Sequence, residues 1–145
     1  MIKVTEQISA AIDELGYTPA EIRRLEPDEQ EKTYRECLLH FVRSGDRRWW
    51  WEDFKVTAFS IDHLHQPYLH LEQYIPAATP KVWWMVEDDT ETCYPIYECI
   101  PAVLKSLIGN CYSFEYYVID PEMKWLICEN HHEVLIGAGV FSDGF

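Results

Sequence analysis

The residues best suited to chemistry stand near the end of the chain, in the pentad 129–133. It combines two carboxylates with the Asn130 amide and two adjacent imidazoles, His131 and His132. Imidazole and carboxylate groups bind metal ions, transfer protons and make polar contacts with partner proteins. Apolar runs flank the pentad on both sides, so it is predicted to form the turn of a β-hairpin.

Three uses of this turn remain open. Adjacent side chains on a strand point to opposite faces, so His131 and His132 would share one metal ion only if the turn made them converge. Alternatively, the turn presents His131 and Glu129 to a partner while Asn130 takes a left-handed backbone conformation. The third interpretation is a tight polar turn with solvated histidines.

Cys128 lies directly before the turn and is the cysteine best placed to act as a nucleophile. A neighbouring carboxylate such as Glu129 raises a thiol pKa rather than lowering it, which argues against that role. A hydrolase that uses Cys128, His131 and His132, either metal-assisted or cysteine-dependent, stays an alternative to a binding function.

A second possible metal site contains His63 and His65. On a strand these two imidazoles would share one face, and His70 could add a third ligand. The spacing matches no familiar zinc motif, and nearby prolines disturb the local geometry.

An acidic loop and a tryptophan run are further candidates for partner contacts. Glu87, Asp88 and Asp89 could hold a hard cation, but they lack the ligand spacing and the glycine of an EF-hand loop. A patch that complements a basic partner suits them better. Tryptophan is a favoured interface anchor, and on a strand Trp50 would face away from its two tryptophan neighbours.

Size and composition indicate one domain over residues 1–145. Hydrophobic residues make up 48% of the chain, which is ample for a core of that size. The five cysteines are odd in number and form no Cys-x-x-Cys pair, so a reduced, cytoplasmic protein is expected rather than a disulfide or zinc framework. We also expect no membrane span and no signal peptide.

The net charge of −13 restricts the choice of partner. A surface this negative repels phosphate backbones, so nucleic-acid binding is disfavoured. It attracts a basic protein, most strongly toward the second half, because residues 81–145 hold 3 basic and 11 acidic side chains. The same charge could instead serve only to keep an aromatic-rich protein in solution.

Periodicity and turn signals predict an α+β fold. N-terminal helices are expected to pack on a mostly antiparallel sheet that has one inserted helix and ends in a three-stranded meander. The predicted helices cover 5–15 (capped by Thr5 and ended by Gly16), 19–25, 27 to about 45, 68–74 and 98–108. The predicted strands cover 49–51, 56–61, 81–86, 93–97, 112–118, 124–128 and 134–138.

The C-terminal segment resembles that of other proteins. Residues 114–117, 125–132 and 134–137, whose core reads WLICENHHEVLIG, look like the signature of a group of small bacterial proteins of unknown function. In size, acidity and α+β make-up the chain is also similar to immunity proteins of bacterial polymorphic toxin systems, including the SUKH group. That resemblance implies a protein-binding role, and no site residue is carried over from it.

These observations favour a non-enzymatic, acidic binding protein, most plausibly an antitoxin that masks a basic toxin domain. No catalytic residue, metal ligand or cofactor is assigned. A self-associating structural subunit is a further alternative. The expected contact residues are Glu87, Asp88, Asp89, Glu129, Asn130, His131, His132 and Trp50.

Overall fold

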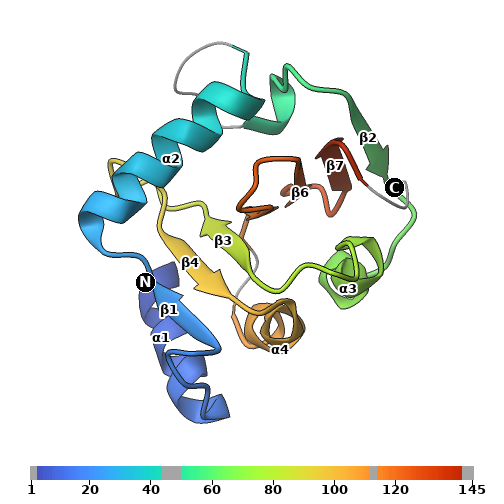
Figure 1. The fold of residues 1–145 in the computed structure, drawn as a ribbon. Helices are drawn as coiled ribbons and strands as arrows, with labels where there is room; N and C mark the ends of the chain where they lie inside the picture. The colour runs from blue at the N-terminus through green and yellow to red at the C-terminus, as the bar shows by residue number, and fades with distance from the viewer. Residues whose placement is uncertain (1–2, 44–49, 112–113, 142–145) are drawn as a thin grey trace.

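One seven-stranded antiparallel sheet forms the centre of the molecule (Figure 1). The computed structural model describes residues 3–43, 50–111 and 114–141. Within them the strand order is β1-β4-β3-β5-β6-β7-β2. The strands are β1 (Ile22–Arg24), β2 (Ala58–Ile61), β3 (Val82–Val86), β4 (Ile96–Cys99), β5 (Tyr116–Ile119), β6 (Trp125–Glu129) and β7 (Leu135–Gly139).

Helices cover both faces of this sheet, so the α+β prediction is confirmed. They are α1 (Val4–Leu15), α2 (Pro27–Phe41), α3 (Leu71–Tyr74) and α4 (Leu104–Gly109), with 3₁₀ turns at η1 (Trp50–Glu52), η2 (Pro67–His70) and η3 (Pro101–Val103). As Figure 1 shows, α2 lies apart from α1, α3 and α4, on the other side of the sheet.

Two hydrophobic clusters follow from the alternation of side chains along each strand. Trp84 and Val118 point into the cluster that contains residues of α1, α3 and α4. Their neighbours Met85 and Tyr117 point into the cluster that contains residues of α2 together with Trp50. Because both faces are buried, the central strands are apolar almost throughout, instead of alternating with polar residues.

The C-terminal meander is confirmed. β5, β6 and β7 pair in sequence, with Tyr116 opposite Glu129. Between β5 and β6, the Asp120 carboxylate accepts hydrogen bonds from the backbone N–H groups of Glu122 (3.1 Å) and Lys124 (3.2 Å), which closes that turn. The pentad turn therefore lies at the opposite end of β6.

The predicted helix over 19–25 is wrong, because this segment contains β1. Glu21 does accept a hydrogen bond from the Thr18 backbone N–H (2.9 Å), as a helix-start signal would. The chain then becomes extended because Ile22 pairs with Cys99 of β4. Pairing with a distant strand overrides the local propensity here. Thr5 lies inside α1, whose N-cap is Lys3, whereas Gly16 ends this helix as predicted.

Other boundaries shift for similar reasons. Trp50 belongs to a 3₁₀ turn and not to a strand, while Trp49 and the predicted helix end at Gly45 lie outside the described residues. β4 takes up 96–99, so the inserted helix begins only after it. No helix in the described parts of the chain has the length and apolar character needed to cross a membrane.

Close packing between the end of β7 and the start of β6 can be tested by substitution. A Cβ at Gly139, where φ is +100°, would lie 2.3 Å from the Lys124 carbonyl oxygen. A Cβ at Gly16, where φ is +76°, would meet open space. We expect Gly139→Ala to lower the free energy of unfolding by more than about 3 kcal/mol and Gly16→Ala by about 1 kcal/mol, measured by urea denaturation. Equal losses would contradict this close approach.

Candidate functional site

The predicted hairpin turn connects β6 to β7, and Asn130 closes it. The Asn130 side-chain oxygen accepts hydrogen bonds from the backbone N–H groups of His132 (2.9 Å) and Val134 (3.1 Å). Asn130 is buried, so this amide acts inside the turn. The left-handed residue is Glu133 (φ +59°) and not Asn130 as expected. The turn is thus a pre-formed element that leaves the side chains of His131, His132 and Glu133 exposed.

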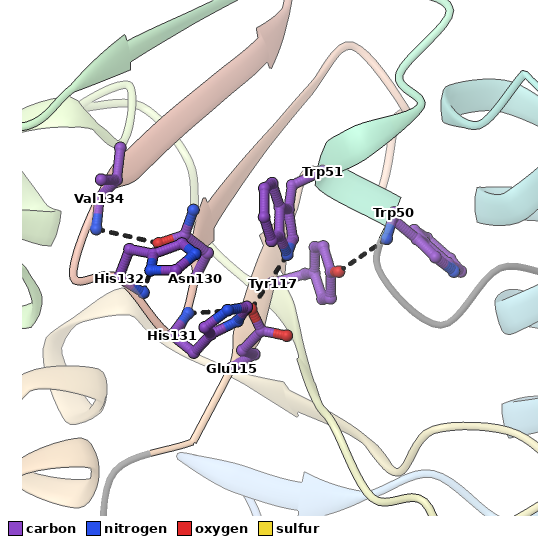
Figure 2. A network of polar contacts seen from close by, with 8 residues as sticks. All are labelled: Trp50, Trp51, Glu115, Tyr117, Asn130, His131, His132 and Val134. Atoms are coloured by element: carbon purple, nitrogen blue, oxygen red, sulfur yellow. Dashed lines mark hydrogen bonds and ion pairs between the residues drawn. The ribbon is translucent and has the colours of Figure 1, made fainter.

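A buried carboxylate holds this turn against the rest of the protein. Glu115, directly before β5, is only 4% exposed. Its Oε2 atom accepts hydrogen bonds from the Trp51 indole Nε1–H (3.0 Å) and from the backbone N–H of His131 (2.9 Å). The same oxygen lies 2.8 Å from His131 Nδ1. Figure 2 shows Glu115 at the centre of these contacts, between the 3₁₀ turn and the hairpin turn.

The Glu115 carboxyl stays ionised in spite of its burial. Burial raises its pKa, but hydrogen bonds with Glu87 and His131 and the charge of His131 together bring the pKa below its usual value. An ionised carboxylate can only accept a hydrogen bond, so His131 donates to Glu115 through Nδ1–H. Nε2 is then the ring nitrogen of His131 that does not bond to Glu115.

Three rings meet beside this carboxylate. The ring centroids of His131 and His132 lie 4.0 Å apart. The centroid of the Trp51 ring lies 5.7 Å from that of His131 and 6.1 Å from that of His132. The His131 side chain is 45% exposed, His132 is exposed and Trp51 is half-buried. We call these three residues the Trp51–His patch. The imidazoles therefore do converge, as one interpretation of the turn required.

A different contact lies across the sheet from Glu115. The Tyr116 hydroxyl donates a hydrogen bond to Glu129 Oε1 (2.7 Å). Burial raises the pKa of Glu129, the bond from Tyr116 lowers it, and the neighbouring Glu133 charge raises it again, for a net increase. Tyr116 is buried and its own pKa is raised well above the usual value, so this phenol stays neutral.

The acidic loop contributes less surface than its sequence suggests. Asp88 is buried, and its Oδ1 accepts hydrogen bonds from the Thr90 backbone N–H (2.9 Å) and hydroxyl (2.6 Å). Glu87 is half-buried beside Glu115, and Asp89 is exposed. Asp89 is therefore the member of this loop best able to meet a partner.

Trp50 is fully buried between the rings of Tyr34 and Tyr117, each 5.4 Å away, so it cannot supply the partner contact expected of it. Its backbone N–H donates to the Tyr117 hydroxyl (3.2 Å), which turns the next residue, Trp51, toward the site (Figure 2). The sequence patterns did not single out Glu115 or Trp51 as site residues. The one signal for Glu115 was a polar residue in the alternating segment before β5.

The geometry gives little support to the two hydrolase variants. Cys128 is fully buried, and burial raises its pKa well above the usual value, so at neutral pH it is a thiol and a poor nucleophile. Over the described ranges, no group of three or more histidine, cysteine or acidic side chains could hold a metal ion. His63 and His65 lie in the loop after β2 and not on the strand, and His70 Nδ1 lies 3.2 Å from the Gln73 amide.

Comparison with known proteins places the chain in one family. The sequence model of a family of unknown function (DUF6756) matches residues 1–143. The chain belongs to this family. No curated protein and no solved structure matches it. The expected membership of an uncharacterised group is thereby confirmed, while the likeness to SUKH immunity proteins stays one of size, charge and make-up.

Asn130 allows a direct test of the turn. We expect Asn130→Ala to lower the free energy of unfolding by about 2 kcal/mol, because two backbone N–H groups lose a buried acceptor. Asn130→Asp keeps the oxygen and should retain more than half of that stability. Urea denaturation of the three proteins at pH 7 measures the difference. If the aspartate variant loses as much as the alanine variant, acceptance by the side-chain oxygen is not what stabilises the turn.

The pKa shifts of Glu115 and Glu129 predict opposite responses to pH. A lowered folded pKa means that Glu115 stabilises the fold above its ordinary pKa of 4.5, and that this contribution is lost as the pH falls. A raised folded pKa means that the contribution of Glu129 is present below 4.5 and is lost as the pH rises.

We therefore expect Glu115→Gln to be less stable than wild type by about 2 kcal/mol at neutral pH, with the gap closing in acid. Glu129→Gln should gain stability relative to wild type as the pH rises above 4.5. Urea denaturation across the acidic-to-neutral range gives both curves. Parallel curves for the two variants would show that the two carboxyl environments do not differ in this way.

Proposed function

We propose that this protein is a non-enzymatic binding protein that masks a basic protein partner, as the antitoxin of a toxin domain. The observation that carries the proposal is the Trp51–His patch, in which a buried carboxylate holds an exposed imidazole beside a tryptophan. Such a patch has the composition and the fixed geometry of an interface anchor.

Pre-organisation is what suits the patch to binding. Ordering a mobile side chain at an interface costs about 0.5–1.5 kcal/mol, and that cost lowers affinity. His131 is already held by two hydrogen bonds to Glu115 before any partner arrives. Trp51 is held by a third to the same oxygen. Binding of a partner would therefore require little further ordering of the His131 and Trp51 side chains.

Charge supports a basic partner. The exposed acids Asp89 and Glu133 flank the same end of the sheet as the patch, and the whole chain carries −13. A field of this sign speeds the approach of a cationic surface and weakens with added salt. Because Asp88 and Asn130 are buried, Asp89 is kept as an expected contact and Glu133 is added to it.

The other functions receive less support. A hydrolase would have the Glu115–His131 pair as its best feature, since a carboxylate on Nδ1 prepares Nε2 to act as a base. Its expected nucleophile, Cys128, is buried. Self-association through a tryptophan face receives less support, because Trp50, Trp84 and Trp125 are at most 3% exposed and the other described tryptophans, Trp51 and Trp83, are half-buried.

The test is capture of a partner from the source cell, with elution by a salt gradient and identification by mass spectrometry. The captured protein is then produced and its association with wild type, Trp51→Ala and Asp89→Lys is measured at low and high salt. We expect Trp51→Ala to weaken binding at least about tenfold, mainly through faster dissociation. Asp89→Lys should slow association, and more so at low salt.

Glu14→Lys on α1 is the matched control, because it makes the same kind of charge reversal at an exposed acid of a helix that does not border the patch. Circular dichroism checks that each variant is folded. If the partner is acidic, if Trp51→Ala binds as wild type does, or if Glu14→Lys and Asp89→Lys slow association equally, the proposed surface is wrong. Rescue of growth by co-expression with the captured protein would distinguish an antitoxin from other binding proteins.

A further inference from the structure

A cavity of about 510 Å³ lies beside the hairpin turn, and His131 and His132 of the Trp51–His patch form part of its lining. Its walls come from η2, the end of α4, the start of β5 and the turn itself. Glu129 and Glu133 supply carboxylates, and Tyr68, Phe114 and Tyr116 supply aromatic rings. Its volume is in the range of pockets that hold small ligands or single large side chains.

The carboxylate of Glu129 is fixed in position. Its Oε1 accepts the 2.7 Å hydrogen bond from the buried Tyr116 hydroxyl. Tyr116 in turn packs edge-on against Phe114, with ring centroids 6.0 Å apart. A half-buried carboxylate is costly to keep charged unless a cation or donor compensates it. The second oxygen of Glu129 is suited to receive such a group.

The aromatic wall is also held in place. The Tyr68 ring lies against Gly109 so closely that a Cβ at this position would be 3.3 Å from Tyr68 Cε2. Glycine at the end of α4 thus makes room for the ring. Aromatic faces next to a carboxylate form a favourable environment for a flat cation, because the ring and the negative charge both attract it.

Backbone strain is concentrated at the rim. Three non-glycine residues with positive φ occur in the described part of the chain, and two of them, Gln66 (φ +50°) and Glu133 (φ +59°), line this cavity. Non-glycine residues in the left-handed region often occur at binding sites.

We propose that this cavity receives an arginine side chain of the basic partner, with the guanidinium paired to Glu129 and stacked against Tyr68. The inference rests on the proposed function and adds the chemistry by which the partner is recognised. The planar guanidinium suits this cavity better than lysine, because it forms two parallel hydrogen bonds to a carboxylate and stacks on aromatic rings. An anionic ligand would be repelled by the two carboxylates.

The test uses N-acetyl-arginine amide as a probe, titrated into the full-length protein and followed by ¹H–¹⁵N NMR. We expect saturable shifts around Tyr68, Gly109 and Glu129. N-acetyl-lysine amide should bind several-fold more weakly, and N-acetyl-glutamine amide should cause no saturable shift. Glu129→Gln, which is expected to fold at least as well as wild type, should weaken the arginine probe at least about tenfold. Tyr68→Leu should also weaken it.

The outcomes separate this inference from the proposed function. Arginine and lysine probes that bind equally, or an arginine probe whose affinity is the same in wild type and Glu129→Gln, would overturn the cavity as an arginine site. Partner capture that depends on Trp51 would still stand in that case. Conversely, specific arginine binding with no captured basic partner would support the cavity and count against the antitoxin. If replacing one arginine of the captured partner weakens binding as much as Glu129→Gln does, both the arginine site and the antitoxin function are supported.

Discussion

The carboxylate of Glu115 joins three parts of the chain that are far apart in sequence. One oxygen receives hydrogen bonds from the 3₁₀ turn after α2 and from the turn between β6 and β7, while Glu115 itself precedes β5. A buried charge is stable only when donors surround it, so this one carboxylate fixes where those three segments meet. The orientation of His131 and Trp51 depends on that arrangement, and so does the surface that they form.

Burial of the sheet on both faces is what makes such an anchor possible. Helices α1, α3 and α4 cover one side and α2 with Trp50 covers the other, which leaves the strand ends as the place where polar side chains gather. At this end, neighbouring residues of β5 point in opposite directions. Glu115 therefore contacts Trp51 and His131, while Tyr116 lines the cavity, which His131 and His132 also border. A single hairpin turn borders both.

The two sides differ in electrostatic character for a physical reason. Glu115 receives several donors and its pKa falls, whereas Glu129 receives one hydrogen bond from a neutral phenol beside another acid and its pKa rises. One oxygen of Glu115 thus meets three internal donor groups, whereas Glu129 has a single hydrogen bond from Tyr116. Glu115 fixes the turn that follows Glu129, so a rigid backbone lies next to a carboxylate whose pKa is raised.

Local patterns in the sequence were sufficient for much of the architecture. Period two over 112–118, the apolar runs on both sides of 129–133 and the apolar segment 81–86 predicted the C-terminal meander, its turn and the strand at 81–86, because such patterns act over a few positions. Gly16 and Pro27 likewise predicted the end of α1 and the start of α2. The acidity of the chain is a property of the sequence alone, and it is the basis for expecting a basic partner.

Features that depend on contacts between distant parts of the chain were decided only by the tertiary structure. Residues 22–24 form a strand because β4 offers a partner edge, although their local signals favour a helix. Trp50 is core and Trp51 is surface because Tyr117, 67 positions away, binds the Trp50 backbone. Glu115 has the pattern of an ordinary outward-facing strand residue, and only folding brings His131 and Trp51 onto it. Such contacts depend on residues brought together by folding, and sequence spacing carries no information about them.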